Sequence, residues 1–124
     1  MEYRFRGWDA TGQKSWVYGD LTHSKRILQE EPYLEDRVMV GGYEVVPESV
    51  GLFTGRKDCH GDDLYEGDIV EIDVSEKVCL GYIFFCRENA GLMYRVGNDA
   101  YSFCMVIQSQ KKGTIYENKE LLEK

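Results

Sequence analysis

The sequence predicts a mainly β protein with an antiparallel, barrel-like (pseudo-barrel) fold and one or two short α-helices. Short segments of strand-like residues are separated by turn signals about every 8–12 residues, a spacing typical of small barrels. The 13 glycines against two prolines favour tight turns, and nine tyrosines favour strands. No internal repeat or flexible linker interrupts the 124 residues, so we expect one domain over residues 1–124.

A hairpin is predicted at the N-terminus. The segment Tyr3–Trp8 alternates between its two faces, Asp9–Gly12 supplies a turn, and Ser15–Tyr18 returns as the second strand. Aspartate is suited to such a turn because it can accept a backbone hydrogen bond, and glycine because it adopts positive φ.

The best candidate for a helix in the first half is Asp20–Glu31. Thr22 or Ser24 can cap its N-terminus, Ile27–Leu28 supplies a modest apolar face, and Pro32 prevents its continuation. Because the stretch is short, an irregular loop is the alternative for the same residues.

The remaining strands are predicted from β-branched and aromatic residues between turn signals. Gly81 lies inside the most strand-like of them and indicates a bulge or a close approach of another backbone. We expect Asn118 to cap a short helix over Lys119–Glu123. The expected extended segments are Val38–Val40, Tyr43–Val46, Val50–Thr54, Ile69–Val74, Val78–Cys86, Leu92–Val96, Ala100–Ile107 and Ile115–Tyr116, with a turn region over Gly55–Leu64.

The charge of the chain argues against nucleic acid as a partner. It carries 15 basic and 22 acidic residues, a formal net charge of −7. Binding to nucleic acid draws its affinity largely from Lys and Arg placed on phosphates, so an acidic chain is poorly suited to it. The one small basic candidate is Lys111–Lys112, beside Gln108 and Gln110, and such a pair is usually a solvated loop.

Neither a secretory signal nor a membrane span is expected. The first residues are polar, and the longest apolar run, Val78–Cys86, is shorter than the about 20 residues that a span needs. We therefore expect a cytoplasmic protein. The four cysteines, Cys59, Cys79, Cys86 and Cys104, form no CxxC pair and are expected to be reduced and mostly buried.

Three segments together carry a family signature. The first is Phe5–Asp9 (FRGWD), the second lies between Val46 and Val70 (VPESVG, FTGRKD, Gly61, LYEGDIV), and the third is Gly113–Leu122 (GTIYENKELL). In their order and spacing they resemble the YopX family, small proteins encoded by bacteriophages and prophages. The resemblance covers nearly the whole chain, with the variable part around residues 10–37 as the exception.

The resemblance implies a mainly β pseudo-barrel with a small helix packed on it, and a phage or prophage origin in a bacterial host. It brings no established activity and no catalytic, metal or cofactor residues to carry over. Arg56 stands where a Leu-like residue is common, so its side chain is not expected to be buried. The signature residues are interpreted as structural: Trp8, Asp9, Thr54, Gly55, Asp58, Gly61, Tyr65, Glu66, Gly67, Asp68, Tyr116, Glu117 and Asn118.

Carboxylates are dense from Asp62 to Asp73. Such a cluster of oxygens could hold Ca²⁺ or Mg²⁺ and serve a metal-dependent hydrolase built on residues 58–73. An EF-hand starting at Asp58 fails, however, because Gly61 falls at its fourth position. We interpret Asp58 and Gly61 as one turn and Glu66–Asp68 as a second, in which Asp68 accepts backbone hydrogen bonds. Six of the twelve residues from Asp62 to Asp73 are carboxylates: Asp62, Asp63, Glu66, Asp68, Glu71 and Asp73.

Other catalytic patterns are weak. Cys59 and His60 could both ligate zinc, but a structural site needs four ligands, and His23 and the single cysteines lack the paired spacing. We interpret the dipeptide as an exposed turn. Only His23 and His60 could act as a neutral-pH base, and there is no phosphate-binding glycine loop, so we expect no enzyme and no cofactor.

Surplus aromatic residues lead to the functional hypothesis. They could form a stacking platform for bases, but the usual Lys and Arg around it are missing, and cross-strand pairing in the core explains them better. Because alternation along the strands places some of these rings on the outer face, we expect a non-catalytic domain that binds a protein partner or a second copy of itself. A nucleic-acid-associated small barrel and the metal-dependent hydrolase are the alternatives. The aromatic residues are Tyr82, Phe84, Phe85, Tyr94, Tyr101 and Phe103.

Overall fold

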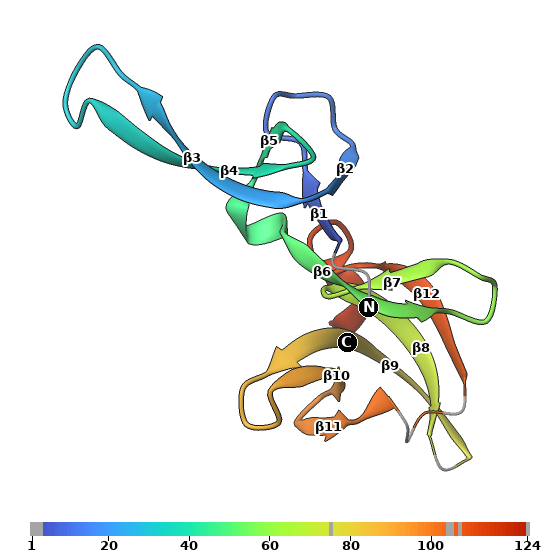
Figure 1. Cartoon of the computed structure of the whole chain (residues 1–124). Coiled ribbons are helices and arrows are strands. Elements are labelled where there is room, and N and C mark those ends of the chain that lie inside the picture. Colours follow the sequence, from blue (N-terminus) through green and yellow to red (C-terminus); the bar gives the residue numbers. More distant parts are fainter. Residues whose placement is uncertain (1–3, 75, 104–105, 107, 124) are drawn as a thin grey trace. The chain divides into compact units, whose positions relative to one another are not determined.

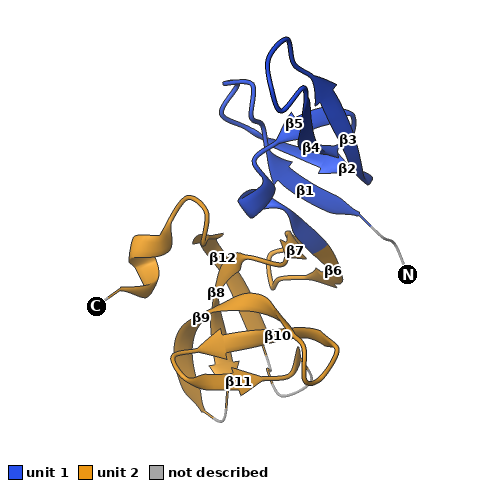
Figure 2. Cartoon of the chain, turned by 90° about the vertical axis from the view of Figure 1, so that its left-hand side faces the viewer, with its two compact units in different colours: residues 1–52 blue, residues 53–124 orange. Residues whose placement is uncertain are grey.

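A computed structural model describes residues 4–74, 76–103, 106 and 108–123. They form two compact units, residues 1–52 and 53–124, coloured blue and orange in Figure 2. No helix in these ranges is both long and apolar enough to cross a membrane. The elements, with strands labelled in Figure 1, are β1 (Phe5–Trp8), β2 (Trp16–Gly19), β3 (Leu21–Ile27), β4 (Leu34–Val40), β5 (Tyr43–Val45), η1 (Pro47–Ser49), β6 (Gly51–Lys57), β7 (Asp63–Tyr65), β8 (Asp68–Val74), β9 (Lys77–Cys86), β10 (Gly91–Val96), β11 (Asp99–Tyr101), β12 (Gln108–Thr114) and η3 (Lys119–Leu122).

The prediction of a mainly β, antiparallel fold is confirmed, and the predicted barrel and α-helices are not. In the second unit, five strands follow the order β11-β10-β9-β8-β12. Strands β11 and β12 lie at opposite edges of this sheet, so the described strands do not close into a barrel. The helical elements η1 and η3 are short 3-10 helices of 3 and 4 residues.

The first unit contains the predicted N-terminal hairpin. Strands β1 and β2 pair from Phe5 opposite Gly19 to Trp8 opposite Trp16, and the start of β6 pairs with the other edge of β1. Gly7 allows β1 to pack on β5, because a Cβ atom there would lie 2.7 Å from the Val45 side chain. The buried hydrophobic residues described in this unit are Val40 and Val45.

The predicted helix over Asp20–Glu31 is wrong, because these residues contain strand β3. Strand β3 pairs with β4 along its whole length, from Leu21 opposite Val40 to Ile27 opposite Leu34. Polar cross-strand pairs stabilise the hairpin, as in the hydrogen bond from Arg37 Nε to Ser24 Oγ (2.7 Å). Short isolated helices are marginal in water, so a pairing partner decides the conformation of this polar segment.

The second unit holds the larger core, on one face of the five-stranded sheet. Strands β8, β9 and β10 confirm the predicted strands there, and Gly81 marks a close approach: a Cβ atom at Gly81 would lie 2.3 Å from the Arg95 carbonyl oxygen. The buried members of the core are Leu64, Val70, Ile72, Val74, Ile83 and Tyr94, and Cys79, Leu92, Val96, Tyr101, Phe103 and Val106 pack against them.

The C-terminal third differs most from the prediction. The expected strand Ala100–Ile107 ends as β11 at Tyr101, and Cys104, Met105 and Ile107 of that segment lie outside the described residues. The last strand is β12, and the predicted extended piece Ile115–Tyr116 is instead the turn after it. Asn118 precedes a 3-10 turn, not an α-helix, and its side chain does not cap it but accepts a hydrogen bond from the Thr114 amide (3.2 Å).

Candidate functional site

Asp58 organises the first signature turn, which connects β6 with β7. Its Oδ1 accepts hydrogen bonds from the amides of His60 (2.9 Å) and Asp62 (2.8 Å), and Gly61 has a φ of +86° that suits glycine. Its Oδ2 accepts a third from the amide of Lys111 on β12 (3.0 Å). Burial raises the pKa of Asp58, but these amide hydrogen bonds outweigh burial and hold the pKa below its usual range.

Asp68 organises the second signature turn, which leads into β8. Its side chain is fully buried, and Oδ2 accepts a hydrogen bond from the Tyr65 amide (2.7 Å). Oδ1 lies 3.4 Å from Nζ of Lys111. Both aspartates thus accept hydrogen bonds from backbone amides of their own turns.

Both aspartates converge on a single residue of the edge strand β12. Asp58 binds the backbone amide of Lys111, and Asp68 pairs with its ammonium group. The register between β12 and β8 shifts between Lys111 and Gly113, so these contacts hold β12 next to an irregularity. The Lys111–Lys112 pair is consequently no free basic patch, because Lys111 is engaged by Asp68.

The other carboxylates of the stretch do not converge on one point. Asp63 forms an ion pair with Lys57 (2.6 Å), and Asp62 is exposed in the turn. Glu71 and Asp73 are half-buried and alternate with the buried residues of β8. Within the described ranges, no three His, Cys, Asp or Glu side chains lie close enough together to hold a metal ion.

The remaining signature residues join separate elements of the backbone. In the first unit the Trp8 amide donates to Ser49 Oγ (2.7 Å), and Asp9 accepts from the Thr11 amide (3.0 Å). In the second unit Thr54 Oγ1 donates to the Leu64 carbonyl (2.8 Å). These contacts match their interpretation as structural residues.

The second and third signature segments meet at Gly67. Its amide donates to the Ile83 carbonyl and its carbonyl accepts from the Ile115 amide, both at 2.8 Å. Beside it, Thr114 Oγ1 accepts a hydrogen bond from the Glu117 amide (3.0 Å), while Tyr116 is exposed. The signature is thus a set of contacts that joins β8, β9 and the end of β12.

The histidines and cysteines are dispersed. Cys59 and His60 are exposed in the first signature turn, as expected, and His23 lies on β3 of the other unit. The expectation of mostly buried thiols is wrong for the described cysteines, since only Cys86 is buried, Cys79 is half-buried, and Cys104 lies outside the described residues.

The aromatic residues divide between core and surface. The Tyr94 and Phe103 rings pack with centroids 4.7 Å apart, which confirms the core role of Tyr94. On β9, Phe84 contacts Tyr82 and lies under the Arg95 guanidinium, 4.4 Å from the ring centroid. Phe85 points to solvent with 49% of its surface exposed.

A hydrophobic surface lies where the sequence suggested a helix. We call the β3–β4 hairpin the arm, and Ile27, Tyr33 and Leu34 the arm tip. Strand β5 pairs with β4 at Val38–Val40 and not farther along the arm, so the outer half of the arm has two strands and extends beyond β5 in Figure 1. Ile27 is 84%, Tyr33 54% and Leu34 52% exposed, and Ile27 lies opposite Leu34 in the register.

The loop of the arm is closed by backbone hydrogen bonds, which present the tip as a defined surface. The Leu28 amide donates to the Tyr33 carbonyl (2.7 Å), and the Tyr33 amide donates to the Glu30 carbonyl (2.9 Å). On the neighbouring pair, Lys25 Nζ donates to Asp36 (2.7 Å), and this hydrogen bond and the lysine charge lower the pKa of Asp36.

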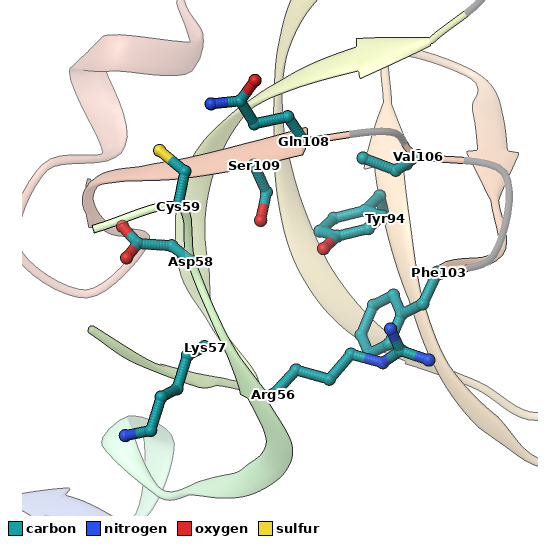
Figure 3. Close-up of a pocket in the computed structure, with 9 residues that line it drawn as sticks. All are labelled: Arg56, Lys57, Asp58, Cys59, Tyr94, Phe103, Val106, Gln108 and Ser109. Atoms are coloured by element: carbon teal, nitrogen blue, oxygen red, sulfur yellow. The ribbon is translucent and has the colours of Figure 1, made fainter. Parts of the chain in front are cut away.

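A cleft of about 460 Å³ lies within the second unit (Figure 3). It is lined by the end of β6, by Tyr94 of β10, and by the start of β12. Arg56 is exposed, as its position in the sequence suggested, and its guanidinium lies 5.2 Å from the centre of the Phe103 ring. Sequence patterns gave no sign of this cleft, because its walls come from residues about 50 positions apart in the chain.

Comparisons with known proteins show the family and the fold of the chain. The family model described as "YopX protein" matches residues 4–123. The chain belongs to the YopX family. Among solved structures, this YopX-family chain is similar to the crystal structure of protein EF1440 from Enterococcus faecalis, with 21% sequence identity, a TM-score of 0.60, and 99% of each chain covered. At this identity the similarity shows the fold alone. A comparison with curated proteins found no match.

Proposed function

We propose that this YopX-family chain is a phage- or prophage-encoded, non-catalytic protein of the bacterial cytoplasm that acts by binding another protein through the arm tip. The observation that carries the proposal is the exposure of Ile27, Tyr33 and Leu34 at the end of a two-stranded arm. Grouped exposed apolar side chains on a soluble protein mark interaction sites more often than single ones do.

The energetics of the arm favour a bound state. A two-stranded hairpin without a covered hydrophobic face is marginally stable in water, so burial against a partner stabilises it. Fully burying a side chain such as Ile or Leu contributes about 1.5–3 kcal/mol, and Tyr adds a large surface with a polar end that suits interfaces. Two or three such side chains are enough to form the centre of a binding site.

The charges around the tip indicate the chemistry of the partner. Lys25 is paired with Asp36, and Arg26 with Glu44. Within the described ranges no basic side chain pairs with the exposed carboxylates Glu30, Glu31 and Glu35. Together with the net charge of −7, they oppose self-association and favour a partner that surrounds an apolar socket with basic groups.

The non-catalytic part of the proposal is supported by the signature turns. Asp58 and Asp68, the two buried carboxylates of the acidic stretch, are already engaged by amides and by Lys111. Groups used in this way are poorly placed to act as acid, base or metal ligand without loss of the turn.

Site-specific photo-cross-linking in bacterial cells tests the proposal. A photoreactive phenylalanine replaces Tyr33 in one variant and Val78 in another, because Val78 is an equally apolar side chain, 66% exposed, on β9. We expect a cross-link to another protein from position 33 and none from position 78, lost when Ile27→Asp is added. Cross-links of equal yield from both positions would contradict the proposal. A cross-link from position 33 to a second copy, with a matching dimer in light scattering, would overturn the choice of a different protein as partner.

A further inference from the structure

The cleft of the second unit is independent of the arm and has the size of a small-molecule site. Its volume of about 460 Å³ lies within the range of roughly 300–1,000 Å³ that is usual for such sites. One end of the wall is apolar, with Phe103 and Val106, and the other is polar, with Gln108 and Ser109 (Figure 3). A ligand with one polar end and one apolar end therefore fits it.

Arg56 supplies a positive charge that no described carboxylate neutralises. Its neighbour Lys57 is paired with Asp63, and Asp58 accepts three backbone amides, whereas among the described residues the Arg56 guanidinium contacts the Phe103 ring and pairs with no carboxylate. In Figure 3 the guanidinium of Arg56 lies beside Phe103, whereas the side chain of Lys57, which also lines the cleft, points in the opposite direction. A guanidinium held over a ring keeps its in-plane N–H groups for an anion, which it can bind with two parallel hydrogen bonds.

Two hydroxyl groups lie in the cleft as neutral hydrogen-bond partners. The Tyr94 hydroxyl and the Ser109 side chain point towards each other in Figure 3 and are hydrogen-bonded. Burial raises the pKa of Tyr94 above its usual value, although the Ser109 hydrogen bond and the Arg56 charge partly oppose this. Tyr94 consequently stays protonated near neutral pH and can donate a hydrogen bond.

From this geometry we propose that the cleft binds a small organic oxyanion, a carboxylate or a phosphate monoester. The anionic group binds the Arg56 guanidinium, the hydroxyls of Tyr94 and Ser109 complete its hydrogen bonds, and the apolar body of the ligand lies against Phe103 and Val106. Carboxylates and phosphates share the bidentate geometry that guanidinium recognises, so the site defines the charge and the apolar body of the ligand.

NMR titration of the full chain tests this site. The probes are benzoate, phenyl phosphate and the uncharged benzyl alcohol. We expect saturable shifts of the signals of Arg56, Phe103 and Ser109 with at least one of the two anions, and no saturation with the alcohol. The anion that saturates at the lower concentration identifies the oxyanion class. The absence of a saturable shift with either anion up to about 10 mM would overturn the proposal, because a functional small-ligand site is expected to saturate below that concentration.

Two variants from the same strand separate binding from structural effects. Because a charge-assisted bidentate contact is worth about 1.5–3 kcal/mol, Arg56→Gln is expected to weaken anion binding about tenfold or more. Lys57→Gln removes an equal charge that is exposed, paired with Asp63 and directed away from Arg56, so it is expected to leave the affinity within about twofold. Equal losses in both variants, or none in Arg56→Gln, would reject Arg56 as the anion-binding residue. Both side chains are exposed, and urea unfolding checks that both variants are folded.

Discussion

In the second unit, Asp58 and Asp68 are buried and hydrogen-bonded, whereas the arm tip in the first unit leaves Ile27 and Leu34 in solvent. Charged groups are normally found at the surface and large apolar groups inside, so each region reverses the usual arrangement. The reversal has a different meaning in each. A buried, satisfied carboxylate fixes the backbone around it, and an exposed apolar group is available for a partner.

The comparison therefore separates residues that stabilise the fold from residues that we propose bind a partner. The acidic stretch over residues 58–73 looks like the site of chemistry in the sequence, but its two buried carboxylates, Asp58 and Asp68, hold turns and β12. The arm carries no signature residue, and its tip lies outside the buried cores, yet the tip presents the apolar surface. Substitutions in the two regions should consequently have opposite consequences for stability and for binding.

The largest effect on stability is expected for Asp68→Ala. The substitution removes the buried hydrogen bond to the Tyr65 amide and the partner of Lys111, and we expect a loss of about 2–4 kcal/mol in the free energy of unfolding. Urea unfolding followed by tyrosine and tryptophan fluorescence measures it. Asp73→Asn, a half-buried carboxylate on the same strand, is the control and should change the free energy by less than about 0.5 kcal/mol. Equal effects in the two variants would contradict a special role for Asp68.

A smaller effect with a distinct pH dependence is expected for Asp58→Asn. Losing the charge on three amide hydrogen bonds should cost about 1–2 kcal/mol at pH 7. The pKa of Asp58 is lowered in the folded state, so its ionised form stabilises the fold above the unfolded pKa of about 3.9, and this stabilisation is lost as the pH falls through the folded pKa. The difference between wild type and variant should therefore shrink below about pH 4. A difference in unfolding free energy that is constant from pH 7 to about pH 3 would refute this assignment.

The carboxylates beside the arm tip should act on association and not on stability. Replacing Glu30, Glu31 and Glu35 together by Gln removes the exposed charges that we propose attract a basic partner. We expect the association rate to fall several-fold at low salt and to lose most of its salt dependence, by the usual behaviour of charged rims. Stopped-flow or surface-plasmon measurements at two salt concentrations test it. A faster association of the variant would show that the partner is not basic at this rim.

The smallest change in stability is expected at the arm tip itself. Ile27 is 84% exposed, so Ile27→Asp should alter the free energy of unfolding by no more than about 0.5 kcal/mol. Urea unfolding measures this change in free energy under the same conditions as for Asp68→Ala. A loss comparable to that of Asp68→Ala would mean that Ile27 belongs to the core of the fold and not to a binding surface.

Local chemistry predicted the turns and the apolar strands well. Asp58 with Gly61 and Asp68 with Gly67 form turns because their side chains and φ angles suit them, and this information is local. Strands β8 and β9 could be predicted because their β-branched and aromatic residues lie between turn signals.

Strands β3 and β12 could not be predicted in the same way. The sequences LTHSKRI and QSQKKGT are polar and lack a clear period of two, and their conformation depends on the partner strands β4 and β8. The contact between Asp58 and Lys111 joins residues 53 positions apart, and no local pattern contains it. The arm tip was missed for a related reason, since Ile27–Leu28 suits a helix face equally well when the hairpin is unknown.

The claim that binding resides in the arm is tested most directly by the dissociation constant of the chain with the protein cross-linked at position 33. We expect Ile27→Asp to weaken this complex at least tenfold, since it places a charge where an apolar side chain is buried. The matched substitution Val78→Asp, at another exposed apolar side chain, should leave the dissociation constant within about twofold. A complex that Ile27→Asp leaves intact, or that Val78→Asp weakens equally, would contradict the account.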